Sequence, residues 1–262
     1  MRSARLRRAL VAAGVLIGAW LLVPTLIVIP ISFSGEDSFA FPPSSWSLRH
    51  YATFFTEPSW LNALLISIQL AMIVTVVATV LGTAAAFTLS HTAFRGKGVL
   101  NGLFLAPLIV PGIVVAVAVY AAFLEWGLIG TPTGFVVAHT VLALPFVTVN
   151  VGAALGGFDR TLERAAAGLG ASSLSTFRRV TLPLIMPGVL SGAVFAFVTS
   201  FDEVVVSLFV QSPQLQTLPV RMFTSVTNEV DPTIAAASTV VITVTTALLA
   251  LTAALRRTRR HV

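Results

Sequence analysis

Six long apolar blocks constrain the fold of this chain more than any other feature. They run approximately Leu10–Ser32, Leu61–Ser90, Leu100–Leu124, Thr133–Leu155, Pro187–Val210 and Thr233–Leu255. About 20 apolar residues suffice for a helix to cross the hydrocarbon core of a bilayer. The blocks are continuously apolar, whereas the strands of a membrane barrel alternate in pieces of about ten residues. The sequence therefore predicts an all-α, polytopic membrane protein with six transmembrane helices.

The basic residues predict the orientation of these helices. Of the 16 Lys and Arg residues, 14 lie before the first block, in the second and fourth connections, and in the tail. Only Arg49 and Arg221 lie on the other side. Because cytoplasmic loops carry an excess of Lys and Arg, both termini are predicted to be cytoplasmic, as in a multi-pass protein of a bacterial inner membrane. The net charge of +6 then reflects short inter-helix segments, and no nucleic-acid partner is expected.

The same pattern suggests three regions. Residues 1–60 comprise a basic start, the first helix and an external segment; residues 61–255 form a five-helix core; residues 256–262 form a basic tail. The first block has the basic start of a signal peptide, but its apolar run is too long and no A-x-A pattern follows. We expect it to be a retained helix.

The cytoplasmic segment 156–187 is patterned rather than a simple connector. Apolar and small residues recur at helical period at Phe158, Leu162, Ala165, Ala166 and Leu169. Gly170 is a plausible C-terminal stop, and Ser172 or Ser173 would cap a second short helix. The pattern predicts a helix-turn-helix at the membrane surface. It fits a docking face for another protein and, equally, an amphipathic helix resting on lipid headgroups.

The order of residues resembles the "EAA" loop of the permease subunits of ABC importers, which carries Glu-Ala-Ala, three residues, Gly, and a later Leu-Pro. The matching positions are Arg164-Ala165-Ala166, Gly170, Phe177, Val180, Leu182-Pro183 and Pro187. Arg164 occupies the position of the motif's Glu, and Glu163 lies one residue earlier. The resemblance implies that this loop docks onto a cytoplasmic ATPase through Leu162, Glu163, Arg164, Ala165, Ala166, Leu169, Gly170, Phe177, Leu182 and Pro183.

The stretch from Ser200 to Val206 resembles the spermidine/putrescine permeases within that family. This implies a type I ABC importer permease that forms half of a pathway for a polyamine. It also implies two ATPase subunits, a second homologous permease in a heterodimer, and an external solute-binding protein. Importers of opines, aminophosphonates and ferric iron share the pattern, so the solute stays open.

Asp202 and Glu203 are the clearest physical anomaly, because a carboxylate at bilayer depth costs on the order of 2.5–3.5 kcal/mol on insertion scales. Together with Ser200, they could form a cation-attracting step in the pathway. They could equally make a hydrogen-bonded contact with the partner subunit. The lone His139 of the fourth block is more often a helix-packing donor than a substrate ligand.

Other functions lack their motifs. There is no phosphate-binding G-x-x-x-x-G-K-[ST] loop, so another chain must bind ATP. The four histidines have no metal-ligand spacing, no serine and histidine pair marks a hydrolase, and no cofactor is expected. A secondary transporter would call for an inverted repeat, and none is clear between residues 1–130 and 131–262. Kinks are expected at Pro107, Pro111 and Pro145.

Overall fold

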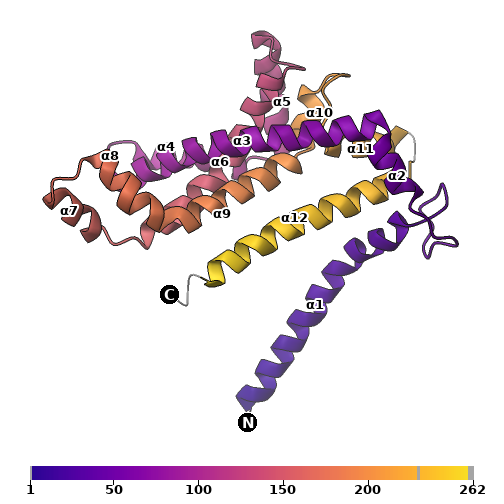
Figure 1. The fold of residues 1–262 in the computed structure, drawn as a ribbon, viewed down its shortest axis with the longest axis horizontal. Coiled ribbons are helices and arrows are strands. Elements are labelled where there is room, and N and C mark those ends of the chain that lie inside the picture. The colour runs from indigo at the N-terminus through magenta and orange to yellow at the C-terminus, as the bar shows by residue number, and fades with distance from the viewer. Residues whose placement is uncertain (1, 229–230, 259–262) are drawn as a thin grey trace. The chain divides into compact units, whose positions relative to one another are not determined.

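The computed structural model describes residues 2–228 and 231–258, and these residues are almost entirely helical (Figure 1). The helices are α1 (Arg2–Ser32), α2 (Arg49–Thr56), α3 (Pro58–His91), α4 (Lys97–Ile109), α5 (Gly112–Trp126), α6 (Pro132–Gly156), α7 (Thr161–Gly168), α8 (Ser173–Thr176), the π-helical turn η1 (Phe177–Thr181), α9 (Leu182–Phe201), α10 (Val205–Val210), α11 (Leu218–Asn228) and α12 (Thr233–Thr258). Glu229 and the end of the tail, with His261, lie outside the described residues.

Five described helical stretches are long and apolar enough to cross a membrane, and α4 with α5 supplies a sixth if the pair counts as one span. The pair bends by 108° at Val110 and Pro111. Pro111 lies at this break, as its ring and missing N–H predict. Pro107 and Pro145 lie inside helices that continue past them. The expectation of a polytopic all-α protein is confirmed.

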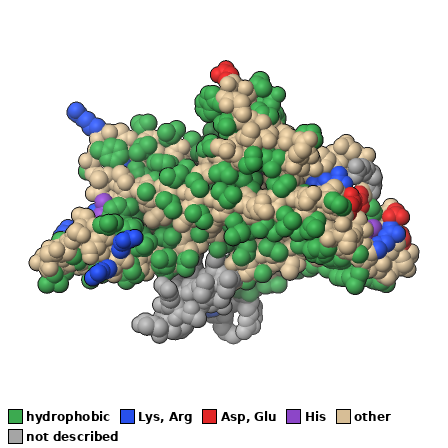
Figure 2. Space-filling view, turned by 45° about the horizontal axis from the view of Figure 1, so that its top comes forward, with side chains coloured by type: hydrophobic (Ala, Val, Ile, Leu, Met, Phe, Trp, Pro, Cys, Tyr) green, Lys and Arg blue, Asp and Glu red, His purple; other side chains and the backbone are tan. Residues whose placement is uncertain are grey.

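Hydrophobic side chains are spread over the whole visible surface, and charged side chains are few (Figure 2). Along α1 the apolar side chains from Leu10 to Leu22 are largely exposed, and Trp20 is among them. A water-soluble protein would bury such side chains, whereas lipid tails solvate them. The exposed apolar surface is therefore suited to contact lipid or other membrane helices.

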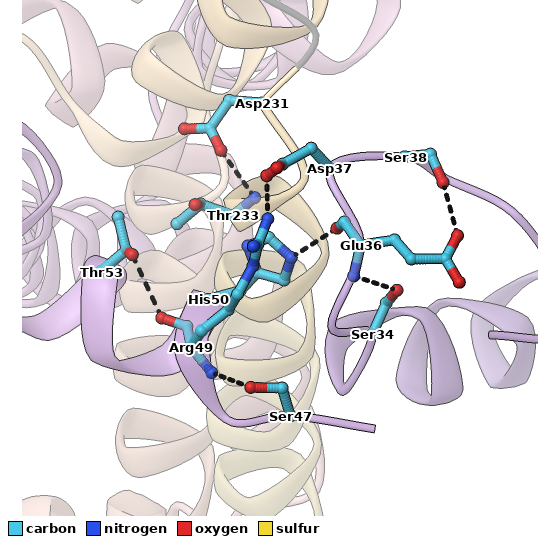
Figure 3. A network of polar contacts seen from close by, with 10 residues as sticks. All are labelled: Ser34, Glu36, Asp37, Ser38, Ser47, Arg49, His50, Thr53, Asp231 and Thr233. Atoms are coloured by element: carbon cyan, nitrogen blue, oxygen red, sulfur yellow. Dashed lines mark hydrogen bonds and ion pairs between the residues drawn. The ribbon is translucent and has the colours of Figure 1, made fainter. Parts of the chain in front are cut away.

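The chain divides into two compact units, of which the first comprises residues 1–61 and 222–244. Its loop after α1 is closed by two backbone hydrogen bonds, Gly35 N to Ser45 O (3.0 Å) and Ser47 N to Phe33 O (2.7 Å). Figure 3 shows its polar contacts: Arg49 pairs with Asp37, and the His50 ring bonds the carbonyl oxygen of Glu36 at 3.0 Å.

Asp231 links two segments of the first unit. Its carboxylate accepts a hydrogen bond from the backbone of Thr233 (2.9 Å) and another from the indole of Trp60 (3.3 Å). The first bond stabilises the start of α12, where the backbone N–H groups lack helical partners. Trp60 and Phe54 are fully buried. The beginning of α3 is thereby fixed to the beginning of α12.

The second unit comprises residues 62–221 and 245–262, and its core lies between α6 and α9. Val147 of α6 fits against glycines on both neighbouring helices. A Cβ atom at Gly192 of α9 would lie 3.0 Å from the Val147 Cα, and one at Gly82 of α3 would lie 2.7 Å from the Val147 Cβ. Small residues let membrane helices approach closely, so these glycines set the spacing of α3, α6 and α9.

Two expectations about local structure are wrong. The fifth apolar block is not one helix, because α9 ends at Phe201 and α10 begins at Val205. The second helix predicted for segment 156–187 is not separate, because α8 continues through η1 into α9, giving an unbroken helical run from Ser173 to Phe201. A π turn holds an additional residue within a helix, and hydrophobic period alone does not reveal it.

Candidate functional site

The first candidate site is the segment from α7 to η1, whose shape depends on Gly170. This residue has a φ of +84°, and its N–H donates to the Ala167 carbonyl while the Ala171 N–H donates to that of Ala166. These two bonds form a Schellman motif, which ends α7 as the sequence predicts. Ser172 then caps α8 by accepting a hydrogen bond from the Ser175 N–H at 3.3 Å.

The turn displays apolar side chains instead of burying them. Leu169 is 90% exposed, and Leu162 and Leu174 are also exposed. Arg164 and Ala165 are exposed on the same helix. Exposed apolar side chains that are surrounded by polar residues are typical of an interaction surface. This arrangement suits the docking role that the sequence predicts.

Glu163 secures this exposed turn to the rest of the unit. One carboxylate oxygen lies 3.0 Å from Nε2 of His91, the last residue of α3, and the other accepts a hydrogen bond from the Thr181 hydroxyl at 2.5 Å. The second ring nitrogen of His91 lies 3.1 Å from the Phe87 carbonyl oxygen. Both ring nitrogens therefore lie within hydrogen-bond distance of an oxygen atom, and one of these atoms belongs to Glu163.

Aromatic packing supports the same contact. The Phe87 ring stacks on His91 with centroids 4.0 Å apart and meets the edge of Phe177 at 5.2 Å. A groove of about 300 Å³ lies beside these rings, with Ala167 and Ala171 in its wall. Of the residues that the sequence singles out, Glu163 and Phe177 meet here. Leu182 and Pro183 begin α9, one turn further along.

His91, Thr181 and Phe87 are functional candidates that sequence reasoning missed. Glu163 and His91 are 72 residues apart, so no local periodicity connects them. The only signals available were a histidine at the end of an apolar block and an acidic residue in the segment after the fourth block, both predicted to lie on the same side of the membrane. Neither specifies a partner without the fold.

The second candidate site is the break between α9 and α10, where Glu203 and Asp202 differ sharply. The Glu203 carboxylate accepts hydrogen bonds from the backbone N–H groups of Val206 (3.0 Å) and Ser207 (2.9 Å). It thus satisfies the free N–H groups at the start of α10. Asp202, at the end of α9, is exposed. The structure leaves Asp202 accessible and commits Glu203 to the backbone.

A buried histidine bridges the two sides of this break. His139 is fully buried in α6, and its ring nitrogens lie 3.0 Å from the Ser200 hydroxyl and 2.9 Å from the Ser207 hydroxyl. Its Nε2 also lies 4.0 Å from a Glu203 oxygen. Because hydroxyls both donate and accept, the ring is satisfied here. Ser200 and Glu203 thus belong to a packing network with His139, the role expected of this histidine, and Asp202 does not.

In residues 2–228 and 231–258, no group of three or more His, Asp or Glu side chains is placed to hold a metal ion. The described carboxylates of the break and of α7 are occupied by backbone, hydroxyl or histidine groups, apart from Asp202.

The chain is similar to several known proteins. Residues 78–261 match the family described as the inner membrane component of binding-protein-dependent transport systems. The chain is 33% identical to the spermidine/putrescine permease PotC of Haemophilus influenzae, over 93% of this chain and 94% of the relative. It is 32% identical to the putrescine permease PotI of Escherichia coli, over 85% and 82%, and 34% identical to the molybdenum permease ModB of Mycobacterium bovis, over 80% and 82%.

The fold has solved counterparts. The structure of a bacterial ABC transporter that imports the acidic polysaccharide alginate matches with a TM-score of 0.72 and 13% identity, over 98% of both chains. An amino-acid ABC transporter matches with a TM-score of 0.60 and 17% identity, over 79% of this chain and 97% of that one. Permeases are transport subunits and not enzymes. This multi-pass membrane protein belongs to the permease family of binding-protein-dependent ABC importers, and it resembles the polyamine permeases within that family.

Proposed function

We propose that this chain forms half of the transmembrane pathway of a polyamine importer in a bacterial inner membrane, with both termini cytoplasmic. A second, homologous permease completes the pathway as a heterodimer, two cytoplasmic ATPases dock at the α7 turn, and an external binding protein delivers spermidine or putrescine. The observation that carries the solute class is the full-length similarity to PotC. The accessible Asp202 carboxylate is consistent with it, because polyamines are cations.

The molybdenum permease relative supplies a second candidate solute class. Molybdenum in water is an oxyanion, and an accessible carboxylate repels an anion where it attracts a cation. Charge at Asp202 therefore discriminates the two classes. Removing it lowers the transport of a polyamine and leaves or raises the transport of an oxyanion.

The test is uptake by the reconstituted transporter with its binding protein, with Asp202→Asn compared with the wild type. A charge at close range is worth about 1–2 kcal/mol in a wet site, so we expect a roughly tenfold loss of spermidine uptake. Glu125→Gln is the matched control, because Glu125 is an exposed carboxylate at the end of α5. Unchanged spermidine uptake by Asp202→Asn would remove the pathway role of this residue. Uptake of molybdate but not of spermidine by the wild type would overturn the polyamine assignment.

Docking of the ATPase at the α7 turn is tested separately. The exposed Leu169 carries this part of the proposal, and Leu169→Ser removes its apolar contact without altering the Schellman motif. We expect less ATPase to co-purify with the variant. Val226→Ser, which changes an exposed apolar residue of α11, is the control for general loss of surface hydrophobicity. Equal co-purification of both variants would contradict docking at this turn.

A further inference from the structure

A cavity of about 490 Å³ in the second unit is lined by both apolar and polar residues. They belong to the end of α3 (Leu89 and Ser90), the beginning of α4 (Lys97, Gly98 and Asn101) and the last turns of α6 (Thr148 and Gly152). Among the described lining residues Lys97 alone is charged, and Ser90, Asn101 and Thr148 supply hydroxyl and amide groups. The cavity thus combines one cation with several hydrogen-bond donors.

A second cation lies at its edge. The Arg160 guanidinium donates one hydrogen bond to the backbone oxygen of Ser90, a lining residue, at 2.5 Å. A guanidinium has five N–H donors, and this bond uses one of them. The acidic side chains that are close to Arg160 in the sequence have other partners: Glu163 bonds His91 and Thr181, and Asp159 accepts a hydrogen bond from the Thr161 backbone. The local balance of charge at the cavity is positive.

The depth of the cavity fits a lipid headgroup. Ser90 is the penultimate residue of α3, Lys97 is the first residue of α4, and Gly152 is one turn from the end of α6. Its lining therefore includes the ends of α3 and α6, two helices that are long and apolar enough to cross a membrane, and such ends lie at the level of the headgroups. Basic pockets between helix ends are sites where anionic lipid headgroups bind.

We propose that this cavity binds a phosphate group, and that the membrane supplies it as the headgroup of an anionic phospholipid. Lys97 provides the charge, Asn101 and Ser90 provide hydrogen bonds, and Arg160 closes the outer edge. The bound lipid joins the ends of α3, α4 and α6, which are otherwise separated by the cavity. This site is independent of the transported solute.

The experiment uses the assembled transporter in nanodiscs of phosphatidylcholine with increasing phosphatidylglycerol, and native mass spectrometry counts the retained phosphatidylglycerol. We expect Lys97→Gln to lower the apparent affinity roughly tenfold. Gly98→Leu should also lower the apparent affinity, because its side chain would occupy the cavity without changing the charge. A Cβ at Gly98 meets no atom within 4 Å, so the backbone can accept the substitution. The matched control is Arg95→Gln, which removes an exposed cation of the same connection that does not line the cavity.

The outcomes separate the sources of phosphate. Loss of phosphatidylglycerol in Lys97→Gln and Gly98→Leu, but not in Arg95→Gln, supports the lipid site. Displacement of that lipid by millimolar inorganic phosphate, dependent on Lys97, supports the phosphate site but assigns it to soluble phosphate. Equal retention by the wild type and Lys97→Gln, or equal loss in Arg95→Gln, overturns the proposal.

Discussion

Replacing Glu163 tests whether the exposed α7 turn is held by the contacts that the structure shows. Glu163→Ala removes hydrogen bonds to His91 and Thr181, and bonds to a charged group contribute about 1.5–3 kcal/mol each. Both partners of the His91 pair retain some solvent contact, with 19% and 18% of their side chains exposed, so the lower end of this range applies. The two bonds together should then stabilise the position of the α7 turn against His91 and Thr181 by about 3 kcal/mol. This corresponds to a roughly 100-fold change in the ratio of anchored to released turn.

Hydrogen exchange measures this quantity directly. In the assembled transporter, the amides of α7 should exchange roughly 100-fold faster in Glu163→Ala than in the wild type. Arg164→Ala changes the exposed neighbouring side chain and serves as the control. The variants His91→Gln, Glu163→Gln and their combination form a double-mutant cycle, in which we expect a coupling energy of about 1–2 kcal/mol. Exchange in Glu163→Ala within about threefold of the wild type, or a coupling near zero, would refute the anchoring role.

Three further outcomes follow from the glycines and from Asp159. Gly188→Val should lower the free energy of unfolding by about 2–3 kcal/mol, and with it the thermal midpoint, because a Cβ there would lie 2.5 Å from the Cβ of Ala154. Gly102→Ala is the control, since a Cβ at Gly102 meets no atom within 4 Å. Equal midpoints of the two variants would contradict close α6–α9 packing. Gly170→Val, strained by about 1–2 kcal/mol at its positive φ, should reduce ATPase co-purification more than Gly170→Asn; the reverse order would exclude the Schellman turn as the cause. The Thr161 backbone N–H holds the pKa of Asp159 below its ordinary value. The ionised Asp159 carboxylate therefore stabilises the first turn of α7 above about pH 4, and this stabilisation is lost as the pH falls further. Hydrogen-exchange rates of the α7 amides, corrected for their intrinsic pH dependence, should show the loss. Asp159→Asn should abolish this pH dependence.

The features that the sequence predicted well are those with a local physical cause. The lengths of the apolar blocks predicted the long helices. The ring of Pro111 predicted a break in the helix, and Gly170 predicted the end of α7. Each depends on a few consecutive residues and on the bilayer as solvent. The residues of the loop motif lie on α7, η1 and the beginning of α9, and their contact with an ATPase is a prediction.

The features that the sequence did not predict depend on contacts between distant segments. The break at Asp202 lies within a block that reads as continuous helix, and it persists because Glu203 caps α10 and His139 bonds Ser200 and Ser207 from another helix. The pairing of Glu163 with His91 is likewise a product of the fold. Intrinsic preference cannot anticipate such contacts, since tertiary packing overrides it.

The continuous run from α8 through η1 to α9 has a mechanical consequence. Its 29 residues, from Ser173 to Phe201, connect the exposed turn to the break at Asp202. The π turn η1 and Pro187 lie within this run, and helices bend preferentially at such points. A movement of the α7 turn therefore reaches the break along continuous helical backbone, with η1 and Pro187 as its hinges.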